Sequence, residues 1–173
     1  MHSNATEQAR DIYIVGLRNQ HAVENQAIEL LERQVGRLEN YPEMRDRMQR
    51  HITESQEQAR RLEELLARHD TSHSTFKDTM MSIVGNLAAL GHSAAPDEVV
   101  KNTFANFAFE HYEIASYSSL LTLAELVGDT AARATLNTSL REEREMAQWI
   151  AEHLDGTIRR FVERSTAGQT AGV

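Results

Sequence analysis

The sequence predicts an all-α protein in which four long helices form a single bundle. Its 173 residues contain only two prolines and eight glycines, so few positions interrupt long helices. Apolar residues recur at spacings of three and four, which places them on one face of each helix. Residues 1–165 are therefore expected to form one domain, and residues 166–173 a disordered tail.

The first two helices are predicted over residues 6–39 and 42–68. Asn40 is expected to cap the end of the first helix, and Pro42 suits the first turn of the second. The link between the two helices is very short, so they must be antiparallel neighbours.

A long crossover is predicted to join this hairpin to a second one. The elements expected there are a short helix over 76–90, a long helix over 97–127 and a long helix over 130–164. Asp97 can accept hydrogen bonds from the first turn of its helix, and Gly128 and Asp129 form a tight turn. Two antiparallel helical hairpins joined by one long crossover are typical of a ferritin-like four-helix bundle.

Net charge and cysteine count exclude several classes of protein. The formal net charge of −8 repels the phosphates of nucleic acids. The chain has no cysteine, which excludes disulfides, thiolate zinc sites and thiol catalysis. No apolar stretch approaches the ~20 residues of a membrane span, and the first residues lack the features of a signal peptide. We therefore expect a cytoplasmic protein that binds neither nucleic acid nor membranes.

Polar residues interrupt the apolar face of every long helix near its middle. A buried carboxylate without a partner is strongly disfavoured, and several facing one another also repel. A cation held between them removes both penalties, so the pattern predicts a metal centre. The interruptions are His21 and Glu24 in the first helix, His51, Glu54, Ser55 and Gln58 in the second, Glu110 and Glu113 in the third, and Glu143 in the fourth. The candidate metal ligands are Glu24, His51, Glu54, Glu110, Glu113 and Glu143.

Carboxylate oxygens together with one imidazole nitrogen favour iron or manganese as the metal. Counted from the turn between their helices, Glu113 and Glu143 are expected to face each other. Glu54 is expected to lie roughly 7 Å from the level of Glu24, at about 1.5 Å of rise per residue. The residues that fit the level of Glu24 better are Glu57 and Gln58.

Each interruption also has a purely structural interpretation. Taken singly, such a residue more often reaches solvent or forms a satisfied salt bridge. His21 is best interpreted as a histidine at the edge of the core. His51 can bond Gln58 or a backbone carbonyl, and Arg61 can neutralise a carboxylate. The coincidence of the interruptions near the middle of all four helices favours a polar central layer.

Four segments carry a resemblance to a known family. They are residues 17–24, HITESQEQARRLE over 51–63, FEHYEIASY over 109–117 and LREERE over 140–145. Through them, over roughly residues 8–160, the chain resembles the YciE/YciF family of ferritin-like bacterial stress proteins. The resemblance implies a usually dimeric bundle, a di-iron-type centre and an association with stress response. The matching positions are Glu24, His51, Glu54, Glu110, Glu113 and Glu143.

Two positions depart from the family's pattern. The family commonly has a tyrosine in place of His21, and it often has an aspartate in place of Ala147. If that aspartate contributes to the metal centre, the site in this chain is weaker, mononuclear or lost.

Two functions from different classes follow. The first is a stress-associated protein with an iron or manganese centre and oxidase or peroxide-related chemistry, with Tyr112 and Tyr117 as hydrogen-bonding neighbours. The alternative is a metal-free dimeric scaffold that binds protein partners under stress, its carboxylates neutralised by His51, Arg61 and Arg141 or by shared protons. No nucleophile elbow, phosphate loop or triad spacing supports a hydrolase.

A homodimer is expected through an apolar patch on the crossover helix. That patch comprises Phe76, Met80, Met81, Val84 and Leu87.

Overall fold

The fold consists of four long helices in a computed structural model that describes residues 2–69 and 96–170. The helices are α1 (His2–Val35), α2 (Pro42–Ala67), α4 (Glu98–Leu126) and α5 (Ala132–Thr166). No strand occurs in the described residues, so the all-α prediction is confirmed. None of the described helices combines the length and the hydropathy that crossing a membrane requires.

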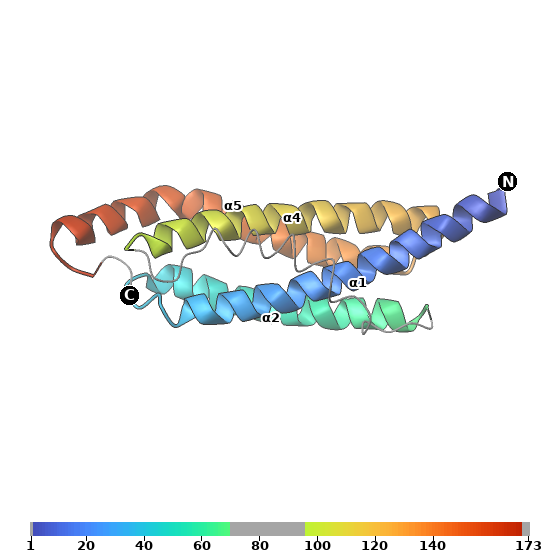
Figure 1. Cartoon of the computed structure of the whole chain (residues 1–173), viewed down its shortest axis with the longest axis horizontal. Coiled ribbons are helices and arrows are strands. Elements are labelled where there is room, and N and C mark those ends of the chain that lie inside the picture. Colours follow the sequence, from blue (N-terminus) through green and yellow to red (C-terminus); the bar gives the residue numbers. More distant parts are fainter. Residues whose placement is uncertain (1, 70–95, 171–173) are drawn as a thin grey trace.

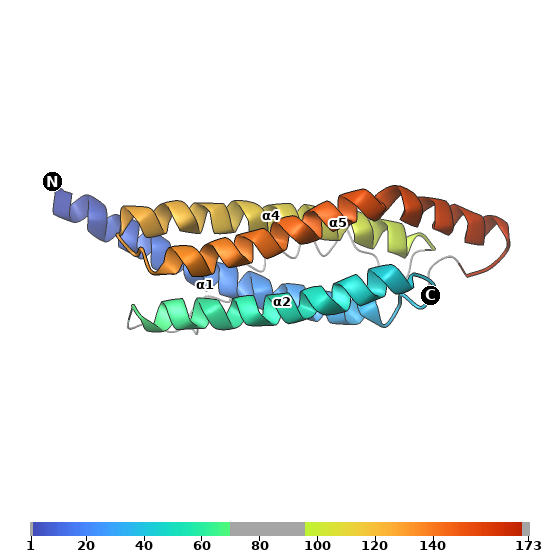
Figure 2. The same ribbon diagram turned by 180° about the vertical axis from the view of Figure 1, so that it is seen from behind.

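The helices are arranged as two antiparallel hairpins packed side by side. α1 pairs with α2 and α4 with α5, while α1 also packs on α4 and α2 on α5. The end of α2 and the start of α4 lie at opposite ends of the bundle (Figures 1 and 2). This is the arrangement of a ferritin-like bundle with one long crossover. The predicted crossover helix over 76–90, with its apolar patch, lies outside the described residues.

The turn between α1 and α2 begins earlier than predicted. α1 ends at Val35, and Gly36, a poor helix former, follows it. Two backbone bonds then tighten the chain, from Arg37 N to Gln34 O at 2.9 Å and from Tyr41 N to Leu38 O at 3.0 Å. Asn40 therefore does not cap α1, but α2 begins at Pro42 as predicted.

The turn between α4 and α5 is a Schellman motif. Gly128 has φ 75°, Asp129 N donates to Ala124 O at 2.8 Å, and Gly128 N donates to Glu125 O at 3.1 Å. The Asp129 carboxylate then accepts the N–H of Ala132 at 3.2 Å. The predicted tight turn is confirmed here.

The start of α4 differs from the prediction that Asp97 caps it. The Asp97 side chain makes no capping hydrogen bond, and its carboxylate pairs instead with Lys101 at 2.9 Å. The neighbouring Glu98 is buried and accepts two hydrogen bonds from Arg37, at 2.6 and 2.8 Å. An ion pair between the two hairpins thus fixes this end of α4.

The core divides into apolar clusters at the two ends of the bundle and a polar layer between them. One cluster is built around Tyr13, Leu17, Leu62, Leu66, Leu120 and Leu136. The other is built around Leu31, Leu38, Met44, Met48, Met146 and Ile150. The apolar clusters hold the four helices in register. The side chains of the polar layer are thereby fixed from both sides.

Candidate metal centre

The polar layer contains all six predicted ligands, but not all at the same depth. The exposed fraction of Glu24, His51, Glu113 and Glu143 is 0%, and that of Glu110 is 2%. The side chain of Glu54 is 30% exposed. Each helix contributes at least one of these residues from the middle of its inward face, so their depth follows from the packing of the bundle.

His51, Glu110 and Glu143, which we call the histidine group, approach one another most closely. One possible ligand atom from each lies within 4.8 Å of the others. His51 Nε2 lies 3.2 Å from Glu110 Oε2 and 3.7 Å from Glu143 Oε2. The three residues come from α2, α4 and α5, so this group joins the two hairpins.

Glu54 supports the histidine group from outside. Its Oε2 lies 2.8 Å from Nδ1 of His51, and Arg47 donates to the same oxygen at 3.0 Å. Glu54 thus faces the ring nitrogen of His51 opposite to the one that points at Glu110 and Glu143. A carboxylate in this position orients an imidazole for metal binding.

A second set of residues, Gln20, Glu24, Glu113 and Tyr117, which we call the amide group, joins α1 to α4. Gln20 Nε2 donates to Glu24 Oε1 at 2.9 Å and to Glu113 Oε1 at 3.1 Å. The Tyr117 hydroxyl donates to the same Glu24 oxygen at 2.6 Å. Gln58 connects the two groups, because its Nε2 donates to Glu143 Oε1 at 2.5 Å and its Oε1 lies 3.4 Å from the Tyr117 hydroxyl.

Several buried atoms of this layer have no hydrogen-bond partner among the described residues. They are Oε2 of Glu24, Glu110, Glu113 and Glu143, and Nε2 of His51. Buried polar atoms in native structures are almost always satisfied, so a group of unsatisfied ones indicates a missing ligand. Four carboxylate oxygens and one imidazole nitrogen in one buried layer fit a cation. The residues present therefore suit a metal ion.

Burial raises the pKa values of the carboxylates. It raises the pKa of Glu24 to about 7, although hydrogen bonds from Tyr117 and Gln20 act in the opposite direction. The pKa of Glu113 lies well above its ordinary value because of burial and of the neighbouring Glu24 and Glu143 charges. The pKa of Glu143 is raised for the same reason, by burial and by Glu110. Without a metal, Glu24 takes up a proton near neutral pH, and the pKa values of Glu113 and Glu143 are shifted in the same direction, toward the protonated form.

The pKa of His51 is raised as well, which for an imidazole favours the charged form. Burial lowers its pKa, but Glu110, Glu54 and Glu143 outweigh burial, and the pKa lies well above the ordinary value. For Glu54 burial raises the pKa, while His51 and Arg47 lower it, and the net shift is downward. A positive charge is therefore favoured at the position where the carboxylates converge.

The sequence predicted only one of the two amide side chains in this layer, Gln58. Gln58 lies at the level that fits Glu24 better than Glu54 does, whereas Glu57 is exposed and pairs with Arg60 at 2.9 Å. Sequence reasoning missed Gln20. Its signal was the spacing, since it lies four residues before Glu24 and therefore on the same helix face.

The basic residues considered as neutralising partners lie elsewhere. Arg61 pairs with Glu142 at 2.6 Å and Arg141 lies 3.7 Å from Glu145, so neither reaches the buried carboxylates. His21 lies at the edge of the core, where its Nε2 is 3.0 Å from Glu63, in agreement with the interpretation from sequence. His51 and bound protons are what remains to neutralise the layer without a metal.

The position of Ala147 is buried, with 5% of the residue exposed, and lies four residues after Glu143. Its side chain offers no ligand atom. The departure from the family's pattern therefore removes one carboxylate from the same face of α5.

Comparison with known proteins bears on the identity of this fold and site. A family model described as "Domain of unknown function (DUF892)" matches residues 8–163. A protein of Xanthomonas campestris of known structure is 28% identical, with a TM-score of 0.77, over 91% of this chain and 99% of that one.

Two further solved structures share the fold. YcfI of Rhodopseudomonas palustris is 24% identical over 83% of this chain and 92% of its own, with a TM-score of 0.72. The Escherichia coli stress protein YciF is 21% identical over 88% of this chain and 98% of its own, with a TM-score of 0.76. The family match and the likeness in fold to YciF confirm the resemblance that the sequence indicated.

Proposed function

The chain belongs to the DUF892 family, and from the geometry of its central layer we propose that it is a metal-binding protein whose histidine group holds an iron or manganese ion. The observation that carries this proposal is the convergence of unsatisfied atoms. His51 Nε2 and one oxygen each of Glu110 and Glu143 are buried within 4.8 Å of one another, and none has a hydrogen-bond partner in the described residues.

The donor set supports the choice of metal. Imidazole and carboxylate are the ligand types of the iron and manganese centres in four-helix carboxylate proteins. The chain has no cysteine to favour a softer ion. A single ion is the simplest occupant. Within residues 2–69 and 96–170, only the histidine group brings three ligand atoms so close, and Ala147 supplies no further carboxylate.

The surrounding residues would prepare the site before the ion arrives. Glu54 holds the His51 ring so that Nε2 faces the two carboxylates. Gln58 fixes Glu143 through one oxygen and leaves the other available. Iron or manganese held by His51, Glu110 and Glu143 would supply redox chemistry toward O₂ or peroxide. Because a protein of the same fold is described as a stress protein, we place this chemistry in a stress response.

The test is to load metal-free protein with Fe²⁺ or Mn²⁺ without oxygen and to follow thermal unfolding. An ion that binds only the native state at a hundred times its Kd stabilises it by about 2.7 kcal/mol. For a chain of this length that corresponds to a rise in Tm of roughly 5–10 °C. Metal analysis after desalting should find about one equivalent of metal.

Two variants on the same helix distinguish binding at the buried site from binding to surface carboxylates. Glu143→Gln removes a buried ligand while keeping its size, whereas Glu145→Gln changes a carboxylate that is 59% exposed. We expect the thermal shift to disappear in the first variant and to persist in the second. If wild-type protein shows no shift and retains under about a tenth of an equivalent, the metal proposal is wrong and the metal-free dimeric scaffold takes its place. The raised carboxylate pKa values would then account for a neutral layer.

A further inference from the structure

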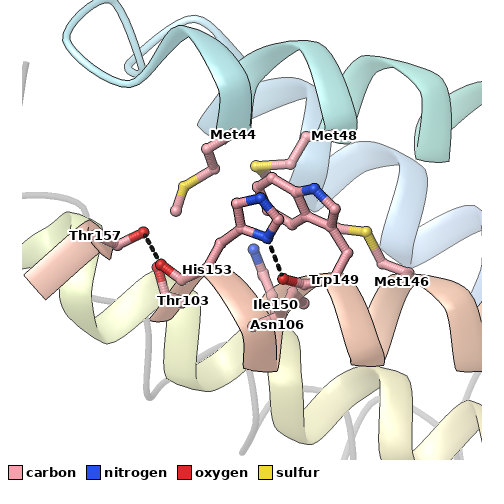
Figure 3. Close-up of a pocket in the computed structure, with 9 residues that line it drawn as sticks. All are labelled: Met44, Met48, Thr103, Asn106, Met146, Trp149, Ile150, His153 and Thr157. Atoms are coloured by element: carbon pink, nitrogen blue, oxygen red, sulfur yellow. Dashed lines mark hydrogen bonds between the residues drawn. The ribbon is translucent and has the colours of Figure 1, made fainter. Parts of the chain in front are cut away.

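A second group of potential metal ligands lies toward one end of the bundle. Three of the six methionines in the chain, Met44, Met48 and Met146, line one small cavity together with His153 and Trp149. In Figure 3 Met44 and Met48 reach from α2 toward His153, whereas Met146 lies at the opposite edge of the Trp149 indole. Thioether sulfurs and an imidazole thus share one space.

The His153 ring is held in one tautomer. Its Nδ1 donates to the backbone oxygen of Trp149 at 2.8 Å, which places the proton on that nitrogen. The remaining nitrogen, Nε2, then carries a lone pair and has no hydrogen-bond partner in the described part of the chain. It lies on the side of the ring that faces α2 (Figure 3). Histidines that bind metals are commonly held in this way by a backbone carbonyl.

The two methionines on α2 are placed to act together. Met44 and Met48 are four residues apart, so they lie on the same helix face, and both are buried. The Trp149 ring stacks on His153 with 4.0 Å between centroids and 16° between planes. This stacking helps to fix the plane of the imidazole beside the two thioethers.

From these contacts we propose that Met44, Met48 and His153 form a binding site for a soft monovalent metal ion, Cu⁺, with Trp149 as its wall. Thioethers select Cu⁺ over harder cations, and imidazole accepts copper as well. Thioethers and the neutral form of imidazole bring no charge to balance an ion, and a single charge costs less to bury than the two charges of a divalent ion. This site is separate from the carboxylate layer and does not depend on the metal proposed there.

The volume of the cavity and its access to the surface agree with a single bound metal ion. The cavity between these side chains measures about 10 Å³, close to the volume that one water-sized probe fills. An open groove of about 440 Å³ adjoins it and shares Met44, Trp149 and His153 as walls. A small ion can therefore reach the thioethers from the surface.

Trp149 makes the proposal directly measurable, because it is the only tryptophan in the chain. Ag⁺ has the same charge and the same preference for sulfur, and it does not change oxidation state in air. Titration of the purified protein with Ag⁺ should change the Trp149 emission and saturate near one equivalent. Cu⁺ kept reduced without oxygen should compete for the same site.

Leucine variants distinguish a ligand from a core residue. Met44→Leu and Met48→Leu keep the apolar volume but remove the sulfur, so folding should be little affected. Each should weaken Ag⁺ binding about tenfold or more, as should His153→Gln at its partly buried position. Met146→Leu, in the same cavity, and Glu143→Gln, in the carboxylate layer, should bind as the wild type does.

Two outcomes would overturn the proposal. One is an emission that shows no saturable change up to about ten equivalents of Ag⁺, far above what one site requires. The other is unchanged affinity in Met44→Leu, Met48→Leu and His153→Gln while circular dichroism shows them folded. In either case the methionines serve only as core packing.

Discussion

The histidine group and the amide group place buried carboxylates in the same layer, yet they satisfy them differently. In the amide group, one Gln20 nitrogen binds Glu24 and Glu113 together, at 2.9 and 3.1 Å. In the histidine group, His51 Nε2 approaches Glu110 and Glu143 to 3.2 and 3.7 Å without completing a hydrogen bond. In the amide group, amides and a phenol bind one oxygen of each carboxylate and leave its Oε2 unpaired among the described residues, whereas only the histidine group adds an unpaired imidazole nitrogen to its carboxylates.

This difference shows two ways in which a helical bundle can hold acids in its core. A carboxylate whose pKa burial raises to about 7, as for Glu24, can be made neutral by a proton. A pair that faces an imidazole is better neutralised by a metal ion, which also satisfies the ring nitrogen. The amide group therefore serves stability, and the histidine group is the candidate centre for chemistry.

The largest expected effect is the pH dependence of the metal-free protein, which tests the proton in the amide group. Glu24 has a pKa of about 7 in the native state against an ordinary value of 4.5, so the native state binds more protons than the unfolded chain. This stabilisation is complete below pH 4.5 and is lost as the pH rises through about 7. The raised pKa of His51 acts in the same direction.

We therefore expect the free energy of unfolding to fall by about 3 kcal/mol between pH 5 and pH 8. Urea unfolding at several pH values measures it. Glu24→Gln is the control. It removes the titrating carboxyl, so the free energy of unfolding should depend less on pH, while the side-chain oxygen can still accept hydrogen bonds from Gln20 and Tyr117. A stability that stays constant or rises over this range contradicts a protonated Glu24.

The second prediction separates the two groups by their metal affinity. Glu143→Gln should weaken Fe²⁺ or Mn²⁺ binding about a hundredfold, or ~2.7 kcal/mol, because it removes a direct ligand. Glu24→Gln should weaken it only a few-fold, because Gln20 and Tyr117 already occupy one oxygen of Glu24. Competition with a metal-binding dye gives both affinities. Equal losses would mean that the amide group also binds metal directly and that the centre is dinuclear.

The fold was largely predictable because helical periodicity is a local signal. The four long helices and the turn at Gly128 could be predicted, because the spacing of apolar residues and the position of a glycine are features of the local sequence alone. The end of α1 at Val35 and the role of Asp97 were not, because short-range hydrogen bonds and ion pairs decide them.

The site was predictable in composition and less so in roles. Five of the six candidate ligands are buried in one layer, as the mid-helix interruptions indicated. Glu54 contacts Nδ1 of His51 and Arg47 instead of the other carboxylates. Gln58 occupies the level of the layer expected for Glu54 and donates to Glu143. A shift of one helical turn separates these two residues, and that is within the error of estimating turn positions from sequence. Gln20 was missed because the ligands were predicted from charged residues on the apolar faces, and an amide is uncharged.

The third prediction concerns how His51 is held. Glu54→Gln should lower metal affinity about tenfold, because its carboxylate fixes the ring and strengthens the opposite nitrogen as a donor. Glu57→Gln, on the same helix but exposed and paired with Arg60, should leave the affinity unchanged. A dye-competition assay at constant pH compares the two. If Glu54→Gln loses as much affinity as Glu143→Gln, Glu54 binds the ion itself.

The smallest expected effect lies in the amide group. Tyr117→Phe removes the hydroxyl that donates to Glu24 at 2.6 Å and should destabilise the metal-free protein by about 1 kcal/mol. The loss is modest because Gln20 still binds the same Glu24 oxygen and the aromatic ring keeps its packing. Tyr112→Phe is the matched control on the same helix, since Tyr112 has no hydrogen-bond partner among the described residues.

The two tyrosine variants also decide whether the amide group is structural. Since the Tyr117 hydroxyl lowers the pKa of Glu24, its removal should raise that pKa further and move the pH transition of stability upward. Tyr112→Phe should leave the transition in place. Metal affinity should change by no more than about threefold in Tyr117→Phe, because the hydroxyl bonds Glu24 and makes no hydrogen bond to a residue of the histidine group. A large loss of affinity with unchanged stability would instead assign Tyr117 to the metal centre and erase the division between the two groups.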